Sequence, residues 1–87
     1  MSEAEMMRDE ALRVLRAAVE EAKGELGTYV SRARVMEQTN NRDLGEFSKI
    51  AHYLAGQGLL AEGVNDYEFF ELTLEGIAMG TSTEAGR

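Results

Sequence analysis

The sequence has no cysteine and no proline, and His52 is its only histidine. Without cysteine there is no disulfide, no thiolate metal site and no cysteine nucleophile. A lone histidine does not supply the three or four ligands that a zinc site needs. The sequence therefore predicts no metal and no cofactor, and its nine glycines take over the chain-breaking role of proline.

Long apolar runs are also missing. No stretch approaches the roughly 18 apolar residues of a membrane-spanning helix, and the acidic start MSEAEMMRDE is unlike a signal peptide. We therefore expect a cytoplasmic protein with no membrane contact. Its 87 residues limit it to one domain, and its 44% hydrophobic and 29% charged residues are typical of a globular chain.

Positive charge is scarce and unevenly placed. The net charge is −7, which disfavours a nucleic-acid partner for the chain as a whole. Residues 28–58 are the exception, because their four basic and three acidic residues give a net charge of +1. Residues 59–87 carry one basic and six acidic residues. An anionic partner would therefore meet the middle third of the chain.

Apolar spacings of three and four in the first part of the chain predict a helix over residues 3–23. A bridge-like strand follows at Thr28–Val30. Ser31 is a candidate N-cap for a short second helix, which we expect to end near residues 40–41, since asparagine tolerates the left-handed backbone of a tight turn.

A second long helix is predicted over residues 43–56. Asp43 and Glu46 have the D-x-x-E spacing of a capping box at its start, and Gly56 and Gly58 mark its end. Capping explains the two acids more simply than a catalytic carboxylate pair does. The apolar stripe of this helix is formed by Leu44, Phe47, Ile50, Ala51 and Leu54.

The last third of the chain predicts a β-hairpin. Its strands are Leu59–Glu62 and Tyr67–Leu72, joined through glycine, asparagine and aspartate. A short helix then ends near residue 80, and residues 81–87 are small, polar and expected to form a flexible tail. The whole pattern predicts an α+β fold that is mostly α.

Thr73 and Gly76 stand at the start of this final helix. Thr73 is interpreted as its N-cap, because a threonine nucleophile needs a base and an oxyanion hole that the sequence does not indicate. Gly76 falls three residues later, where a capping box has Glu or Gln, so we expect close packing to require the glycine. Nothing else favours catalysis, and no enzyme is predicted.

Two motifs carry a resemblance to a known family. YLAGQGLLAEG (residues 53–63) looks like the L-x-x-x-G-L-I pattern in which a helix ends and a wing begins. YEFFELTLEGIAM (residues 67–79) looks like the ending Y-x-L-T-x-x-G. With its order of elements, the chain resembles the winged helix-turn-helix family over residues 5–80. The resemblance implies three helices, a β-hairpin wing and a short C-terminal helix, in a single winged-helix domain over residues 1–80.

The same resemblance implies a function. Residues 43–56 would be a recognition helix that enters the major groove of double-stranded DNA, and residues 61–68 would be the wing. The protein would be a transcriptional regulator, and the family implies a homodimer through the first and last helices, with Ala4, Ala11, Ala18 and Ala22 allowing close helix approach. The side chains that would contact DNA are Arg32, Arg34, Asn41, Arg42, Ser48, Lys49 and His52.

Acidic residues support an alternative. The expected wing contains Glu62, Asp66 and Glu68 and no basic residue, and the expected recognition helix begins with Asp43 and Glu46. Carboxylates facing phosphates oppose binding. The alternative is an acidic winged-helix protein–protein interaction module that binds a basic partner and no DNA. In that case the basic side chains would be solvated helix faces, and His52 an exposed or partly packed helix residue.

Overall fold

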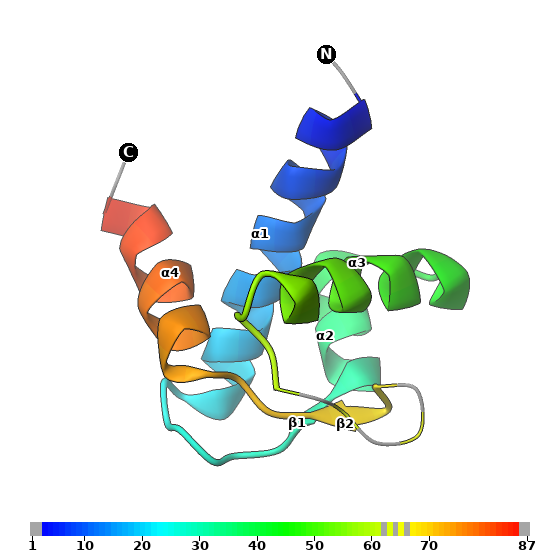
Figure 1. Cartoon of the computed structure of the whole chain (residues 1–87). Coiled ribbons are helices and arrows are strands. Elements are labelled where there is room, and N and C mark those ends of the chain that lie inside the picture. Colours follow the sequence, from blue (N-terminus) through cyan, green and yellow to red (C-terminus); the bar gives the residue numbers. More distant parts are fainter. Residues whose placement is uncertain (1–2, 62, 64, 66, 86–87) are drawn as a thin grey trace.

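The structure is a computed structural model that describes the backbone of residues 3–61, 63, 65 and 67–85, and the side chains of residues 5–61, 63, 65 and 67–81. Within these residues the prediction of a mostly helical α+β fold is confirmed, with four helices and a two-stranded antiparallel sheet (Figure 1). The elements in order are α1 (Glu3–Ala22), β1 (Val30–Ser31), α2 (Arg32–Thr39), α3 (Leu44–Gly56), β2 (Phe69–Phe70) and α4 (Leu74–Ala85).

The long helix α1 lies against the other three helices and has one buried face. Its small and apolar residues meet the core, while charged residues face outward. The helix ends where Lys23 and Gly24 adopt left-handed backbone angles, with φ of 55° and 70°. Ala11, Ala18 and Ala22 are buried in the protein's own core. The expectation that they let a second copy approach is therefore wrong for these three, and Ala4 lies outside the described side chains.

A tight turn joins α2 to α3. Asn40 adopts the left-handed conformation at the end of α2, with φ of 58°. The Asp43 carboxylate caps α3 by accepting a hydrogen bond from the Glu46 backbone N–H at 3.1 Å, so the predicted cap is confirmed. Ser31 occupies the N-cap position of α2, but its side chain makes no capping hydrogen bond.

The sheet is built differently from the predicted hairpin. β1 and β2 pair antiparallel, with Val30 opposite Phe70 and Ser31 opposite Phe69. Among their described residues, the segments predicted as hairpin strands meet at an isolated bridge between Leu60 and Leu72, supported by the Ala61 N–H donating to the Glu71 carbonyl at 2.9 Å. The second predicted strand pairs with two different segments, because Phe70 lies opposite Val30 of β1 and Leu72 lies opposite Leu60. Its pairing with the first predicted strand is therefore shorter than the sequence indicated.

The expected wing is described only in part. Glu62 and Asp66 of that prediction lie outside the described residues, whereas Glu68 is exposed.

The core lies where α3 crosses the inner face of the sheet. Phe47 from α3 and Phe70 from β2 are fully buried, and their ring centroids are 6.2 Å apart. Figure 1 shows α3 on one side of the sheet, with the start of α1 and the end of α4 on the side of the molecule away from the sheet. Leu44 was predicted on the apolar stripe of α3, but it is 50% exposed because it precedes the first turn that reaches the core.

The helix α4 is locked to the chain segment that follows α3. The Thr73 hydroxyl accepts a hydrogen bond from the Gly76 N–H at 3.0 Å and donates one to the Gly58 carbonyl at 2.7 Å, which confirms the predicted cap. A Cβ atom at Gly76 would overlap the carbonyl oxygen of Leu59, so close packing does require this glycine. α4 continues to Ala85, into the segment predicted as a tail.

Replacement of Thr73 by valine is expected to lower the free energy of unfolding by about 1–2 kcal/mol, because the cap and the hydrogen bond to the Gly58 carbonyl are lost together. Urea denaturation followed by circular dichroism measures this loss. The control is Thr81→Val at an exposed position of the same helix. Equal stability of the two variants would show that Thr73 does not hold α4 in place.

Candidate nucleic-acid interface

The outward face of α3 is the candidate interface, and the core determines which residues it contains. Four buried residues fix the rotation of this helix, namely Phe47, Ile50, Ala51 and Leu54. The 3.6-residue period then turns Gly45, Lys49, His52 and Gly56 outward, and all four are exposed, while Ser48 at the edge of this face is half-buried. The structure thus brings Ser48, Lys49 and His52 together on one face, as the sequence predicted.

Asn41 and Arg42 lie in the turn just before this helix. The Asn41 side-chain oxygen accepts a hydrogen bond from the Asp43 backbone N–H at 3.0 Å, which supports the turn. Arg42 is exposed and, with Lys49, lines a hollow of about 590 Å³ between the turn, α3 and the start of α1. Glu46 lines the same hollow, as do Arg13 and Glu10 of α1, so an anion there would meet three cations and two carboxylates.

Arg32 and Arg34 begin α2, and each has a role within the protein. The Arg32 backbone N–H donates to the Glu68 carbonyl at 2.9 Å, which extends the sheet beyond β1, and the residue is half-buried. The Arg34 Nε atom lies 2.9 Å from the Glu21 carboxylate of α1. Glu21 also accepts a hydrogen bond from the Gln38 side chain. Arg34 is therefore already paired, and Arg42 and Lys49 are the better candidates for phosphate contacts.

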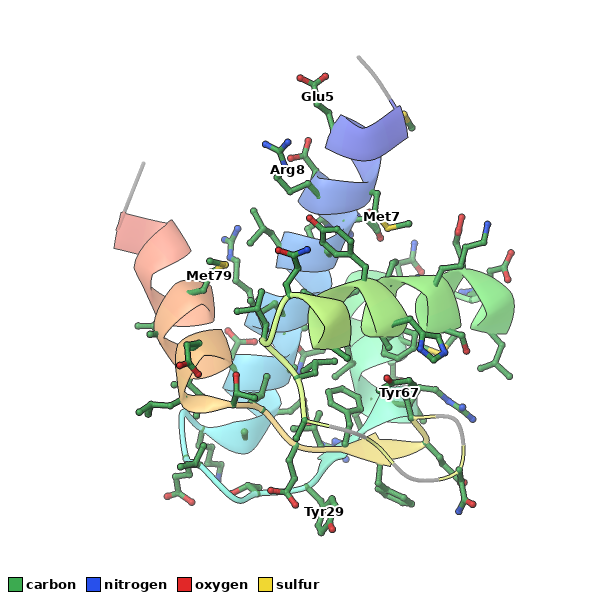
Figure 2. The ribbon with its side chains drawn as sticks, in the orientation of Figure 1. Glu5, Met7, Arg8, Tyr29, Tyr67 and Met79 are labelled. Atoms are coloured by element: carbon green, nitrogen blue, oxygen red, sulfur yellow. The ribbon has the colours of Figure 1, made fainter. Side chains whose placement is uncertain are left out.

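His52 has a neighbour that the sequence did not indicate. Its ring packs edge-on against the ring of Tyr67, with centroids 5.0 Å apart and planes at 88°. Tyr67 is buried and has a positive φ of 67°, which places its ring under α3 (Figure 2). His52 therefore connects α3 to the segment leading into β2 while part of it remains exposed.

Gly45 and Gly56 on the outward face were not predicted as functional. A Cβ atom at Gly45 would make only an ordinary contact with the Asp43 side chain, and one at Gly56 would meet nothing within 4 Å. Internal packing therefore does not require either glycine, although glycine within a helix costs up to about 1 kcal/mol relative to alanine. Because neither residue has a side chain, the backbone of α3 is accessible from outside at these two positions.

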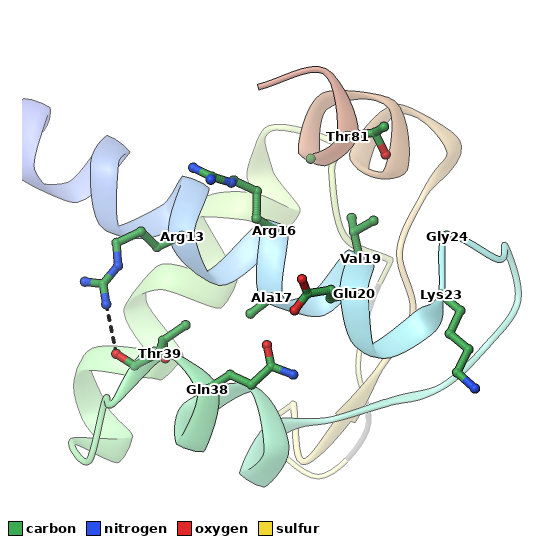
Figure 3. A pocket seen from close by; sticks show the side chains of 11 residues that line it. Arg13, Arg16, Ala17, Val19, Glu20, Lys23, Gly24, Gln38, Thr39 and Thr81 are labelled. Carbon is green, nitrogen blue, oxygen red and sulfur yellow. Dashed lines mark hydrogen bonds between the residues drawn. The ribbon is translucent and has the colours of Figure 1, made fainter. Parts of the chain in front are cut away.

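A second hollow, of about 540 Å³, lies between α1, the end of α2 and α4 (Figure 3). There the Arg13 guanidinium donates to the Thr39 carbonyl at 3.0 Å and pairs with Glu10 at 2.9 Å. Arg13 thereby fixes the end of α2, and hence the turn into α3, against α1. The lining contains Arg16 and other cations together with Glu20, so it does not indicate what charge a ligand there would carry.

The described residues contain no other sign of a bound group. No cluster of three His, Cys, Asp or Glu side chains among them could hold a metal ion, and every buried side-chain nitrogen or oxygen in this part of the chain has a hydrogen-bond partner. None of the described helices has the length and apolar character needed to cross a membrane.

No protein family, curated protein or solved structure matches this chain significantly.

Proposed function

We propose that the protein is a small cytoplasmic winged-helix DNA-binding protein, a transcriptional regulator that places α3 in the major groove of double-stranded DNA. The observation that carries this proposal is the outward face of α3. The helix is anchored by Phe47 in the core, while Lys49, His52 and two glycines remain exposed on its other side. A helix about 10–12 Å in diameter fits the major groove of B-DNA.

The order and pairing of the elements support this proposal. A helix and a short strand precede the α2–turn–α3 unit, and two extended segments follow it. The last segment lies between its two neighbours, because Phe70 pairs with Val30 and Leu72 pairs with Leu60. This arrangement is consistent with a winged helix, in which the two segments after the recognition helix form the wing.

The proposed contacts are few. Lys49 is exposed on the α3 face and Arg42 just before it, and Arg32 lies at the start of α2, where the positive end of the helix dipole favours phosphate although the Arg32 N–H itself donates to the Glu68 carbonyl. Arg34, whose side chain is 71% exposed, would first have to leave Glu21, whose side chain is 17% exposed and would keep its hydrogen bond from the Gln38 side chain. Ser48, His52 and the amide of Asn41 would supply the contacts to bases.

A homodimer would double this small set of contacts. A groove of about 530 Å³ lies between α1, the end of α3 and α4, and Leu12, Tyr53, Leu59 and Met79 contribute apolar lining. Arg8 and Met79 stand at its two sides in Figure 2. We propose that a second copy docks here through its own first and last helices. Sedimentation equilibrium should then show twice the mass of one chain at micromolar concentration, and a single-chain mass throughout that range would contradict the dimer.

Fluorescence anisotropy with a labelled 20-base-pair duplex in a salt series tests the DNA-binding function. Four phosphate contacts per chain, from Arg32, Arg34, Arg42 and Lys49, predict a slope of log K against log salt concentration of about −4 per chain, at roughly −0.9 per contact. The double variant Arg42→Glu, Lys49→Glu is expected to bind at least about 100-fold more weakly at low salt, and to lose about two units of slope.

The matched control is Arg16→Glu, Lys23→Glu, which changes the net charge equally at exposed positions of α1 and its end. This control is expected to retain most of the affinity, because only long-range charge repulsion is added. Equal losses in both double variants, or no DNA binding by the unmodified protein at low salt, would contradict the proposed function.

A further inference from the structure

The outer face of the sheet is an exposed aromatic surface. Side chains alternate along a strand, so the burial of Val30 and Phe70 turns Ser31 and Phe69 to the opposite face. Tyr29, which directly precedes β1, joins them on that side. Tyr29 is 61% exposed and Phe69 is 44% exposed. Figure 2 shows Tyr29 directed away from the helices.

The two segments that form this face differ in composition from the rest of the chain. Residues 24–31 and 67–75 contain no lysine, arginine or histidine. They hold four of the seven exposed large apolar side chains found among the described residues: Leu26, Tyr29, Phe69 and Leu74. They also hold Glu25, Glu68, Glu71 and Glu75. The two segments thus combine exposed apolar side chains with acidic ones, and the nearest cations in the chain are Lys23 and Arg32 at the two ends of the first segment.

We propose that this outer sheet face docks a basic segment of another protein, one that presents arginine or lysine side chains to Tyr29 and Phe69. An aromatic ring attracts a cation placed within about 6 Å of its centre, and adjacent carboxylates add charge-assisted hydrogen bonds. Glu71 lies two residues after Phe69 and therefore on the same side of the strand, and Glu68 directly precedes Phe69; these two residues provide the carboxylates. A guanidinium group stacks on an aromatic ring and pairs with a carboxylate at the same time.

Other occupants fit this surface less well. A second copy docking face to face would bring two surfaces of the same negative charge together. Nucleic acids and anionic lipid surfaces carry the same sign of charge as the edge of the face, so they are repelled. A basic protein segment is the partner that contacts the rings and also neutralises the carboxylates.

This surface does not depend on the proposed DNA-binding face. The buried rings of Phe47 and Phe70 lie between α3 and the inner side of the sheet, so the exposed side chains of α3 and those of the outer sheet face point in different directions. A basic protein segment and a duplex can therefore be bound together. Failure of DNA binding leaves the sheet-face proposal intact, and the reverse also holds.

Selection from a phage-displayed library of random 12-residue peptides, panned against the whole protein, tests the proposal. The enriched peptides are expected to be rich in arginine or lysine. Synthetic copies of them should bind at least tenfold more weakly to the variant Tyr29→Ser, Phe69→Thr. The control Met6→Ala, Leu44→Ala removes two exposed apolar side chains elsewhere and should leave binding unchanged.

A second variant, which changes charge and keeps both aromatic rings, tests the proposal even if Tyr29→Ser, Phe69→Thr does not fold. Glu68→Lys, Glu71→Lys retains both rings and should also weaken peptide binding at least tenfold. Any of four results would overturn the proposal: no enriched peptide, enriched peptides that are neutral or acidic, equal binding to all variants, or self-association of the protein that is lost in Tyr29→Ser, Phe69→Thr.

Discussion

Gly76→Ala is expected to unfold the protein or detach α4, although it adds only one methyl group. The new Cβ would overlap the carbonyl oxygen of Leu59, and that backbone atom cannot move aside as the end of a side chain would. Leu59 is itself fixed, since its N–H donates to the Leu54 carbonyl at 3.0 Å and its carbonyl accepts from the Thr73 N–H at 3.3 Å. Gly76→Leu is expected to have at least as large an effect.

We expect the loss to exceed about 4 kcal/mol, which is a large part of the total stability of a small domain. Thermal and urea unfolding followed by circular dichroism measure it. Gly56→Ala is the matched control, because its Cβ would enter open space at the end of α3, and alanine there should leave stability unchanged or raise it by up to about 1 kcal/mol. A Gly76→Ala variant that unfolds together with the control would show that α4 does not pack on Leu59 as described.

Phe47→Ala is the second change with a large expected effect. Phe47 is fully buried and packs against Phe70, so truncation leaves a cavity between α3 and the sheet. Removing a buried phenylalanine side chain typically costs about 3–5 kcal/mol. With this cavity present, α3 could also rotate about its own axis, and the positions of Lys49 and His52 would change with it.

Leu44→Ala in the same helix is the control for this loss. Leu44 is 50% exposed, and its truncation should change the free energy of unfolding by less than about 0.5 kcal/mol. Urea denaturation of both variants gives the comparison. A loss for Phe47→Ala below about 1 kcal/mol would contradict the packing of α3 against the sheet.

The helices and the caps at Asp43 and Thr73 were predictable because they depend on neighbours in the sequence, whereas the side-chain cap expected at Ser31 does not form. The spacing of apolar residues determined α1 and the buried face of α3, and the D-x-x-E spacing placed the cap at Asp43. Thr73 was predictable for the same reason, although its second hydrogen bond, to Gly58, was not. Local rules do not specify a partner 15 residues away.

The features that were missed depend on contacts between distant segments. The pair between Arg34 and Glu21 spans 13 residues, and no local pattern indicates it. Tyr67 under His52 depends on a positive backbone angle that is uncommon for a tyrosine. The hairpin was overpredicted because alternation shows that a segment is extended but does not show which neighbour it pairs with.

The candidate interface was predictable as a face and not as a set of contacts. The helical period and the apolar stripe were enough to predict that Ser48, Lys49 and His52 lie on one face of α3. The role of Asn41 in holding the turn required the three-dimensional arrangement. The sequence spacing of Gly45 and Gly56, 11 residues or about three helical turns, already indicates that they share one face, and the structure adds that a Cβ atom would fit at both positions.

Titration of the ¹⁵N-labelled protein with a 16-base-pair duplex, followed by amide chemical shifts, tests most directly the claim that α3 is the DNA-binding face. The account predicts that the largest changes fall on residues 41–49 and on His52, with small changes on the outer face of the sheet around Tyr29. Shifts concentrated on the sheet face or α4, or no shifts at low salt, would contradict it.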